Sequence, residues 1–249
     1  MTNTPENLPI EQPPAARIEH AISVHGEDEV VSRAIALLAG YNVGDEFLLY
    51  AGGTHAQGIL DGAPPLYWPE VWGARVLMYA WNDSARDAVV AGLGNQAWRV
   101  REMSAKVIAA RDLKLVDEVT ALTSDEVARV RAQAARTLGE IGDENVIELL
   151  TTLVGDKDID VRRQAGAALR TIKQRTGTTD APTAIAETEP DAAAIPDAEE
   201  AVEAEAVETA DEETIVEVDE KAEVDEEAAV DDEAAVSPVA EESAVDPNA

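Results

Sequence analysis

Apolar residues recur along the middle of the chain with the spacing of one face of an α-helix. Three segments begin at Val100, Val130 and Val161, and in each of them small or apolar residues follow at positions i+4, i+7 and i+8. This spacing predicts one buried stripe per helix. The stripes are Val100, Ser104, Val107 and Ile108; Val130, Ala134, Thr137, Leu138 and Ile141; and Val161, Ala165, Ala168, Leu169 and Ile172. A weaker copy begins at Pro69, so the successive offsets are 31, 30 and 31 residues.

Each period also holds a second, shorter apolar segment, which predicts a second helix. After the stripe from Val100 this segment spans residues 113–122, and after the stripe from Val130 it spans residues 144–153. Turn-forming residues, Asp112 and then Gly142-Asp143, separate the two helices. One helical hairpin cannot bury both of its faces, so hairpins of this kind stack on each other. We therefore predict an all-α fold, a short α-solenoid of stacked helical hairpins.

The remaining parts of the chain have a different character. We divide the chain into a flexible N-terminal segment at 1–26, an irregular helical cap with a Gly/Pro loop at 27–68, the repeats at 69–175 and a disordered acidic tail at 176–249. Within the cap we expect helices at 27–39 and 45–51, followed by a loop because glycine and proline are frequent there. The last repeat helix, 158–173, is expected to have no partner helix.

Charge is distributed unevenly along the chain. It carries 51 acidic and 19 basic residues, which gives a formal net charge of −32. Residues 176–249 hold 26 of the acids and one base, Lys221, so this third of the chain alone accounts for −25. The tail has no aromatic residue, and it cannot bury enough apolar surface to fold by itself. A strongly negative chain repels nucleic-acid phosphate and anionic lipid, so we expect neither as a partner, although the repeats themselves are nearly neutral.

Composition also limits the compartment and the chemistry. The chain has no cysteine, which excludes disulfide frameworks, thiolate metal sites and cysteine nucleophiles. Residues 1–14 lack the basic and apolar regions of a secretory signal, and no apolar run approaches the roughly 18 residues of a spanning helix. We expect a soluble, cytoplasmic protein.

A short motif accompanies the helical repeat. It reads Leu122-Thr-Ser-Asp125 before Val130-Arg131, Leu153-Val-Gly-Asp156 before Val161-Arg162, and in a weaker copy Leu93-Gly-Asn95 before Val100-Arg101. The motif resembles HEAT repeats, in particular the short PBS-lyase-type HEAT-like class, over about residues 69–175. The resemblance implies helical hairpins that mainly supply surfaces for binding, and it says little about activity.

The arginines of this motif are the first candidate functional residues. Arg101, Arg131 and Arg162 recur near predicted helix N-termini, where a positive charge opposes the helix dipole. The polar residues of the preceding loops are Asn95, Asp125 and Asp156. We favour a structural ladder in which these side chains cap helices and couple repeats through the guanidinium fork. The alternative is a basic ridge that binds an acidic partner, helped by Arg99, Arg129 and Arg163.

Aromatic residues form the second candidate. All nine lie between Tyr41 and Trp98, and Trp68, Trp72 and Arg75 are spaced as i, i+4 and i+7. We favour a hydrophobic cap that closes the N-terminal end of the solenoid. The alternative is an aromatic groove for a peptide or ligand, and deep burial of all its tryptophans would exclude it. The partner-binding candidates are Trp68, Trp72, Arg75, Trp98, Arg101, Arg131 and Arg162.

The sequence favours no enzyme. Its only histidines, His20, His25 and His55, lie outside the repeats, and no His-Glu dipeptide occurs. Deoxyhypusine hydroxylase, a HEAT-repeat enzyme similar to this fold, binds iron through such pairs, so we do not expect its activity. Nothing in the residues supports phycobilin lyase chemistry, and no nucleophile elbow is present. We expect no catalytic residue, no cofactor and no metal.

These observations predict a non-enzymatic scaffold that binds a protein partner on its repeat surface. Two other functions remain open at this stage. One is a ligand-binding or lyase-like accessory factor that uses the aromatic N-terminal end, and the other is nucleic-acid binding through the repeat arginines. The acidic tail is expected to aid solubility, or else to contact basic proteins or the protein's own arginine ridge.

Overall fold

The computed structural model describes residues 8–177, and these residues are all-α. The helices are α1 (Pro14–His25), α2 (Glu27–Leu38), α3 (Asp45–Leu60), α4 (Trp68–Val76), α5 (Arg86–Gly92), α6 (Trp98–Ala110), α7 (Val116–Ala121), α8 (Ala128–Ile141), α9 (Ile147–Leu153) and α10 (Ile159–Thr176). The predicted α-solenoid is confirmed. The predicted tail, apart from Thr176 and Gly177, lies outside the described residues.

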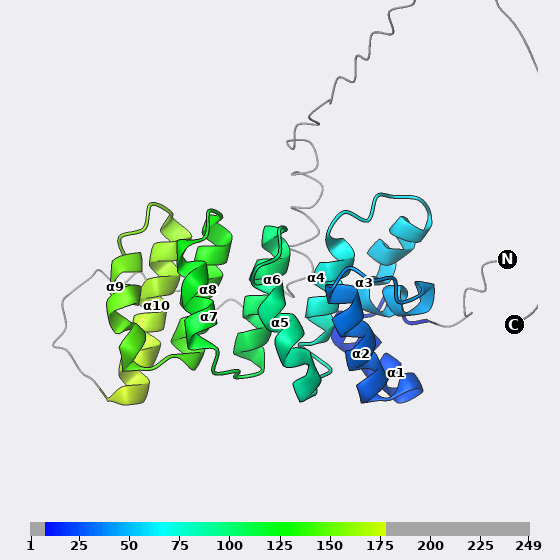
Figure 1. Ribbon diagram of the computed structural model, residues 1–249, viewed down its shortest axis with the longest axis horizontal. Helices are drawn as coiled ribbons and strands as arrows, with labels where there is room; N and C mark the ends of the chain where they lie inside the picture. Colours follow the sequence, from blue (N-terminus) through cyan, green and yellow to red (C-terminus); the bar gives the residue numbers. More distant parts are fainter. Residues whose placement is uncertain (1–7, 178–249) are drawn as a thin grey trace, which may run out of the picture. The chain divides into compact units, whose positions relative to one another are not determined.

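The apolar stripes form the core of the stack. Val100, Val130 and Val161 are fully buried, and every other stripe residue is buried except Leu169, which is half-buried. Each stripe faces a neighbouring helix, because α2, α4, α6, α8 and α10 pack against each other in that order. Figure 1 shows these longer helices following one another along the stack. The 30-residue period therefore positions equivalent residues side by side on successive helices.

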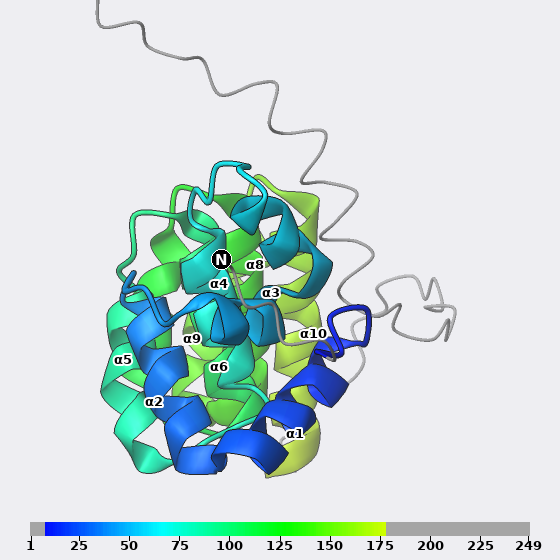
Figure 2. The ribbon, with the colours of Figure 1, turned by 90° about the vertical axis from the view of Figure 1, so that its right-hand side faces the viewer.

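The pairing of helices within a hairpin differs from the prediction. Each short helix packs against the long helix that follows it, so that the hairpins are α5–α6, α7–α8 and α9–α10. The motif loop before each long helix makes this connection: Asp125 accepts a hydrogen bond from the Val127 N–H and turns the chain from α7 into α8. The expectation that the last helix has no partner is wrong, since α9 covers α10. Figure 2 looks along the stack, so that the equivalent helices of successive hairpins lie one behind another.

The N-terminal region is more ordered than the sequence suggested. Residues Pro14–His25, expected to be part of a flexible segment, form α1, which packs on α2 and α3. Arg17 on α1 is buried and donates its Nε–H to the carbonyl of Tyr50 on α3 at 3.0 Å. This buried polar contact and the apolar face of Ile18 and Ala21 fix α1 to the stack. Residues 1–7 lie outside the described residues.

The glycine-rich stretch after Ala51 is helical, where a loop was expected. Helix α3 continues to Leu60, and its two halves meet at Gly53, which has φ 59° and ψ −136°. A side chain at Gly53 would clash, because a Cβ there would lie 2.8 Å from the carbonyl oxygen of Ile10 and 2.7 Å from the Arg17 guanidinium. Glycine therefore serves here to kink a helix around a buried arginine and does not open a loop.

Candidate functional site

A ladder of arginine–aspartate pairs connects successive hairpins. Arg101, near the N-terminus of α6, donates Nε–H and an Nη2–H to the two carboxylate oxygens of Asp125, at 2.8 and 2.9 Å. Asp125 lies in the loop between α7 and α8, so this bidentate pair joins one hairpin to the next. The other Arg101 nitrogen, Nη1, donates to the carbonyls of Asn95 and Gln96 at the start of its own helix. One guanidinium thus holds both a neighbouring loop and the entry to α6.

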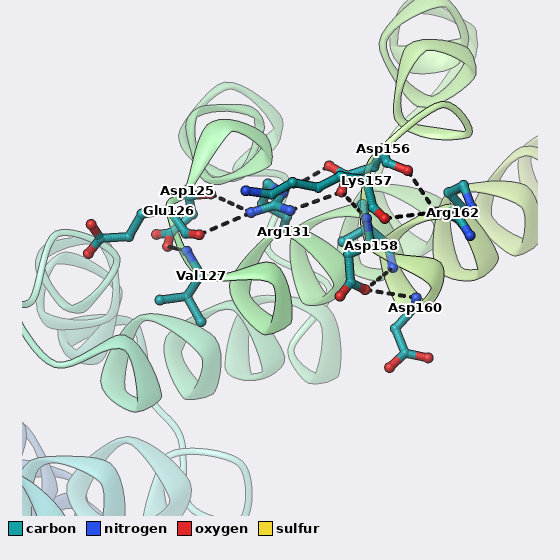
Figure 3. A network of polar contacts seen from close by, with 10 residues as sticks. Asp125, Glu126, Val127, Arg131, Asp156, Lys157, Asp158, Asp160 and Arg162 are labelled. Carbon is teal, nitrogen blue, oxygen red and sulfur yellow. Dashed lines mark hydrogen bonds and ion pairs between the residues drawn. The ribbon is translucent and has the colours of Figure 1, made fainter. Parts of the chain in front are cut away.

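The same geometry recurs one repeat later. Arg131 on α8 donates to both carboxylate oxygens of Asp156, each at 2.9 Å, and its Nη1 donates to the carbonyls of Asp125 and Glu126. Figure 3 shows these contacts continuing to Arg162, whose Nη1 donates to the carbonyls of Asp156 and Lys157. The arginine of each repeat therefore holds its own loop and, where an aspartate follows, the next loop as well.

The first loop of the series has Asn95 where the later loops have aspartate. Asn95 accepts a hydrogen bond from the Ala97 N–H at 2.8 Å, as Asp125 and Asp156 do for their loops. By register, the residue of the preceding repeat that would face it is Glu70, where the later repeats have arginine. Position 70 therefore offers no guanidinium for an ion pair, and the Asn95 amide oxygen keeps the turn of this loop without one.

Both ladder carboxylates are held in the ionised form. For Asp125, burial alone would raise the pKa, but hydrogen bonds from Arg101 and the Val127 N–H, with the charges of Arg101 and Arg131, lower it below its ordinary value. For Asp156 the hydrogen bond from Arg131 is the main cause of a lowered pKa, and burial opposes it. The pairs are therefore charged at neutral pH, and their attraction contributes to stability.

A second arrangement lies at the entry of α4 and α6, where an arginine is enclosed by aromatic rings. We call Tyr67, Trp68, Trp98, Arg99 and Arg129 the arginine–aromatic cluster. The Arg99 guanidinium carbon lies 4.3 Å from the ring centre of Trp98, 5.5 Å from that of Trp68 and 5.8 Å from that of Tyr67. Its Nη1–H also donates to the Tyr67 hydroxyl at 3.0 Å.

The cluster extends over three successive repeats. The guanidinium of Arg129, at the start of α8, lies 5.6 Å from the ring centre of Trp98. Trp68, Arg99 and Arg129 each immediately precede the first stripe residue of their helix, so the period of the stack brings them into one row. Trp68, Trp98 and Tyr67 are half-buried and Arg129 is exposed, which leaves part of each ring at the surface. The stacking of Arg99 and Arg129 on the aromatic rings was not predicted from the sequence. It could have been, because Trp68, Arg99 and Arg129 occupy the same position in successive repeats.

The remaining aromatic candidates belong to the interior. Trp72 is only 3% exposed and packs so closely on α3 that a Cβ at Gly52 would lie 2.5 Å from its ring. Its ring also stacks on Trp68 at a centroid distance of 6.3 Å. Arg75 donates from Nη2 to the Ala51 carbonyl at 3.1 Å and thereby ties α4 to α3. Trp72 thus has the environment expected of the cap, while Trp68 and Trp98 have the partial exposure that a binding surface needs.

The comparison with protein families agrees with this arrangement. A family model described as HEAT repeats matches residues 116–204, and the described part of that match covers α7 to α10. This match supports HEAT repeats in that part of the chain. Arg131, Asp156 and Asp125 of the ladder and Arg129 of the arginine–aromatic cluster lie within the matched residues. Arg101 and the other four members of the cluster precede them. No curated protein matches the chain significantly.

None of the helices between residues 8 and 177 is long and apolar enough to cross a membrane. Within the same range, no three His, Asp or Glu side chains come together in a way that could hold a metal ion.

Proposed function

We propose that this HEAT-repeat protein is a non-enzymatic scaffold that binds another protein through the arginine–aromatic cluster. HEAT repeats commonly serve as protein-interaction surfaces, and the family match supports this general function. The observation that carries the specific proposal is the partial exposure of Trp68, Trp98 and Tyr67 beside Arg99 and Arg129. Tryptophan, tyrosine and arginine are the residues most often found at energetically dominant positions of protein interfaces.

The ladder arginines are left out of the proposed surface. Arg101 and Arg131 are buried, and each already holds a carboxylate and two carbonyls. A partner that displaced these contacts would also have to undo the connection between hairpins. Their function is therefore to keep the helices in register, which fixes the relative positions of the rings in the cluster.

The test is affinity capture from the native lysate with three forms of the full chain. These are the parent, Trp98→Ala, and the control Trp81→Ala. Trp81 is a suitable control because it is also half-buried and also lies under an arginine, Arg111, at 5.8 Å, but it is not part of the cluster. We expect proteins that the parent and Trp81→Ala retain and that Trp98→Ala loses by at least tenfold. If Trp98→Ala, with circular dichroism matching the parent, captures the same proteins in the same amounts, the cluster is not the binding surface.

A further inference from the structure

Arg99 differs from Arg101 and Arg131, the buried arginines of the ladder, in the groups that its guanidinium contacts. It is only 8% exposed, comparable to Arg101 and Arg131. Those two arginines each bind a carboxylate in a bidentate manner. The described contacts of Arg99 are instead the Tyr67 hydroxyl and the faces of three aromatic rings. Ring faces attract a cation but carry no net charge, so within residues 8–177 this buried guanidinium has no counter-anion.

The surrounding helix ends add to the positive potential. α6 and α8 both begin at the cluster, and neither has an acidic residue in its first turn or a side chain that caps its N-terminus. The N-terminus of a helix carries partial positive charge, which normally attracts an acidic residue. Here Arg99 and Arg129 occupy those first turns. A carboxylate placed between them would therefore be attracted by two guanidinium groups and two helix ends together.

Apolar surface lies next to this positive site. The rings of Trp68 and Trp98 are partly exposed, and Leu66, directly before Tyr67, is 65% exposed. Leu66 also has a φ of 47°, a left-handed backbone conformation that is costly for a branched aliphatic residue. Such strain is often found where a loop presents a side chain to a ligand. The rings and Leu66 together offer an apolar contact beside the cations.

We propose that the arginine–aromatic cluster binds a short acidic segment of a partner protein. An aspartate or glutamate of that segment lies against Arg99 and Arg129, and a neighbouring apolar side chain packs on Trp68 and Trp98. This inference rests on the proposed function and adds the chemistry of the partner. A short acidic protein segment is favoured over nucleic acid because the net charge of the chain is −32. A polyphosphate carries a negative charge on every nucleotide, so this net charge repels it more strongly than a segment with one or two carboxylates.

The test begins with selection of phage-displayed random 12-residue peptides on the immobilised full chain. We expect the enriched peptides to contain aspartate or glutamate within three residues of an aromatic or leucine side chain. The most enriched peptide is then synthesised, and its affinity is measured by titration against the parent, Trp98→Ala, Arg99→Gln, Arg129→Glu and the control Arg170→Glu. Arg129 is exposed, so its substitution is not expected to disturb the core even if Arg99→Gln does.

The expected result is a loss of affinity of at least tenfold for Arg99→Gln and Arg129→Glu. Arg170→Glu makes the same charge change on an exposed residue of α10, and we expect it to change affinity less than twofold. If the enriched peptides are neutral or basic but their affinity still falls in Trp98→Ala, the proposal of an acidic partner segment is wrong and the proposed protein-binding function stands. If no peptide depends on Trp98, the proposed function fails as well. Binding of an oligothymidine probe that Arg99→Gln and Arg129→Glu abolish would assign the cluster to single-stranded nucleic acid and contradict the proposal.

Discussion

Arg101 and Asp125 are 24 residues apart in sequence, and their side chains form a two-point contact at 2.8 and 2.9 Å that connects consecutive helical hairpins. The aspartate also folds its own loop by accepting the Val127 N–H. Since both side chains are largely buried, removing one partner leaves a charge without compensation in a place where water cannot replace it. This relationship gives a direct prediction for stability.

Asp125→Asn should lower the free energy of unfolding by about 3 kcal/mol, because Arg101 then remains buried without a counter-charge. The measurement is urea denaturation of the full chain followed by circular dichroism. Glu126→Gln is the matched control, since Glu126 lies 3.7 Å from the same guanidinium but its side chain is 85% exposed. An exposed pair of this kind contributes about 0–1 kcal/mol. Equal effects of the two substitutions would show that the buried pair does not couple the hairpins.

Acid should weaken the ladder in a defined direction. The pKa values of Asp125 and Asp156 are lowered in the folded protein from the ordinary value of 3.8. The contribution of each pair is therefore fully present above pH 3.8 and is lost as the pH falls through the lower folded-state pKa. We expect Asp125→Asn with Asp156→Asn to lose less stability than the parent between pH 5 and pH 2, measured by urea denaturation at each pH. If the unfolding free energy of the double variant falls as steeply with acid as that of the parent, the two aspartates do not cause the loss, because all other carboxylates are the same in both chains.

Close packing of α8 on α10 should be sensitive to a single methyl group. A Cβ at Gly139 would lie 2.7 Å from both the Cα and the Cβ of Ala168, so Gly139→Ala must push the two helices apart. We expect a loss of about 1–3 kcal/mol on denaturation, despite the better helix propensity of alanine. Gly166→Ala is the control within α10, where the new Cβ meets only the end of the Arg170 side chain at 3.7 Å. That change should stabilise the protein by up to about 1 kcal/mol. Stabilisation by both substitutions would contradict the predicted contact.

Ser104 offers a stabilising change inside the core. It is fully buried, and its hydroxyl has no hydrogen-bond partner within the described residues. The equivalent stripe positions of the next two repeats are Ala134 and Ala165. Ser104→Ala removes an unsatisfied polar group, so we expect the unfolding free energy to rise by about 1 kcal/mol.

Thr137 provides the comparison for Ser104, because its buried hydroxyl is satisfied. It donates to the Ala105 carbonyl at 3.1 Å and accepts from the Gln133 amide at 3.0 Å. Thr137→Val should therefore cost about 1–2 kcal/mol in the same denaturation assay. A loss of stability in Ser104→Ala would mean that its hydroxyl does form a hydrogen bond in the folded protein.

The buried residues of each helix could be predicted from their spacing. The contacts between helices could be predicted only in part. The stripes from Val100, Val130 and Val161 gave the buried faces correctly, because burial of a helix face depends on a local period. The loop aspartates and their arginines were recognisable since both recur with the same period. The partner helix of α10 was assigned wrongly, because α7 and α9 are each separated from both neighbouring long helices by short loops, and turn residues mark both boundaries.

The sequence by itself determined that this chain builds stacked helices, because a 30-residue repeat of apolar positions has no other way to bury its surface. It also determined which arginines and aspartates recur. Only the tertiary structure separated Trp72 from Trp68, which are one helical turn apart: the first faces Gly52 on α3 and is buried, whereas the second meets Arg99 from the next repeat. Spacing along a helix fixes the direction of a side chain, but the neighbour it meets depends on how the hairpins stack. For the same reason only the structure revealed that, among the described residues, Arg99 contacts aromatic rings and the Tyr67 hydroxyl and no carboxylate.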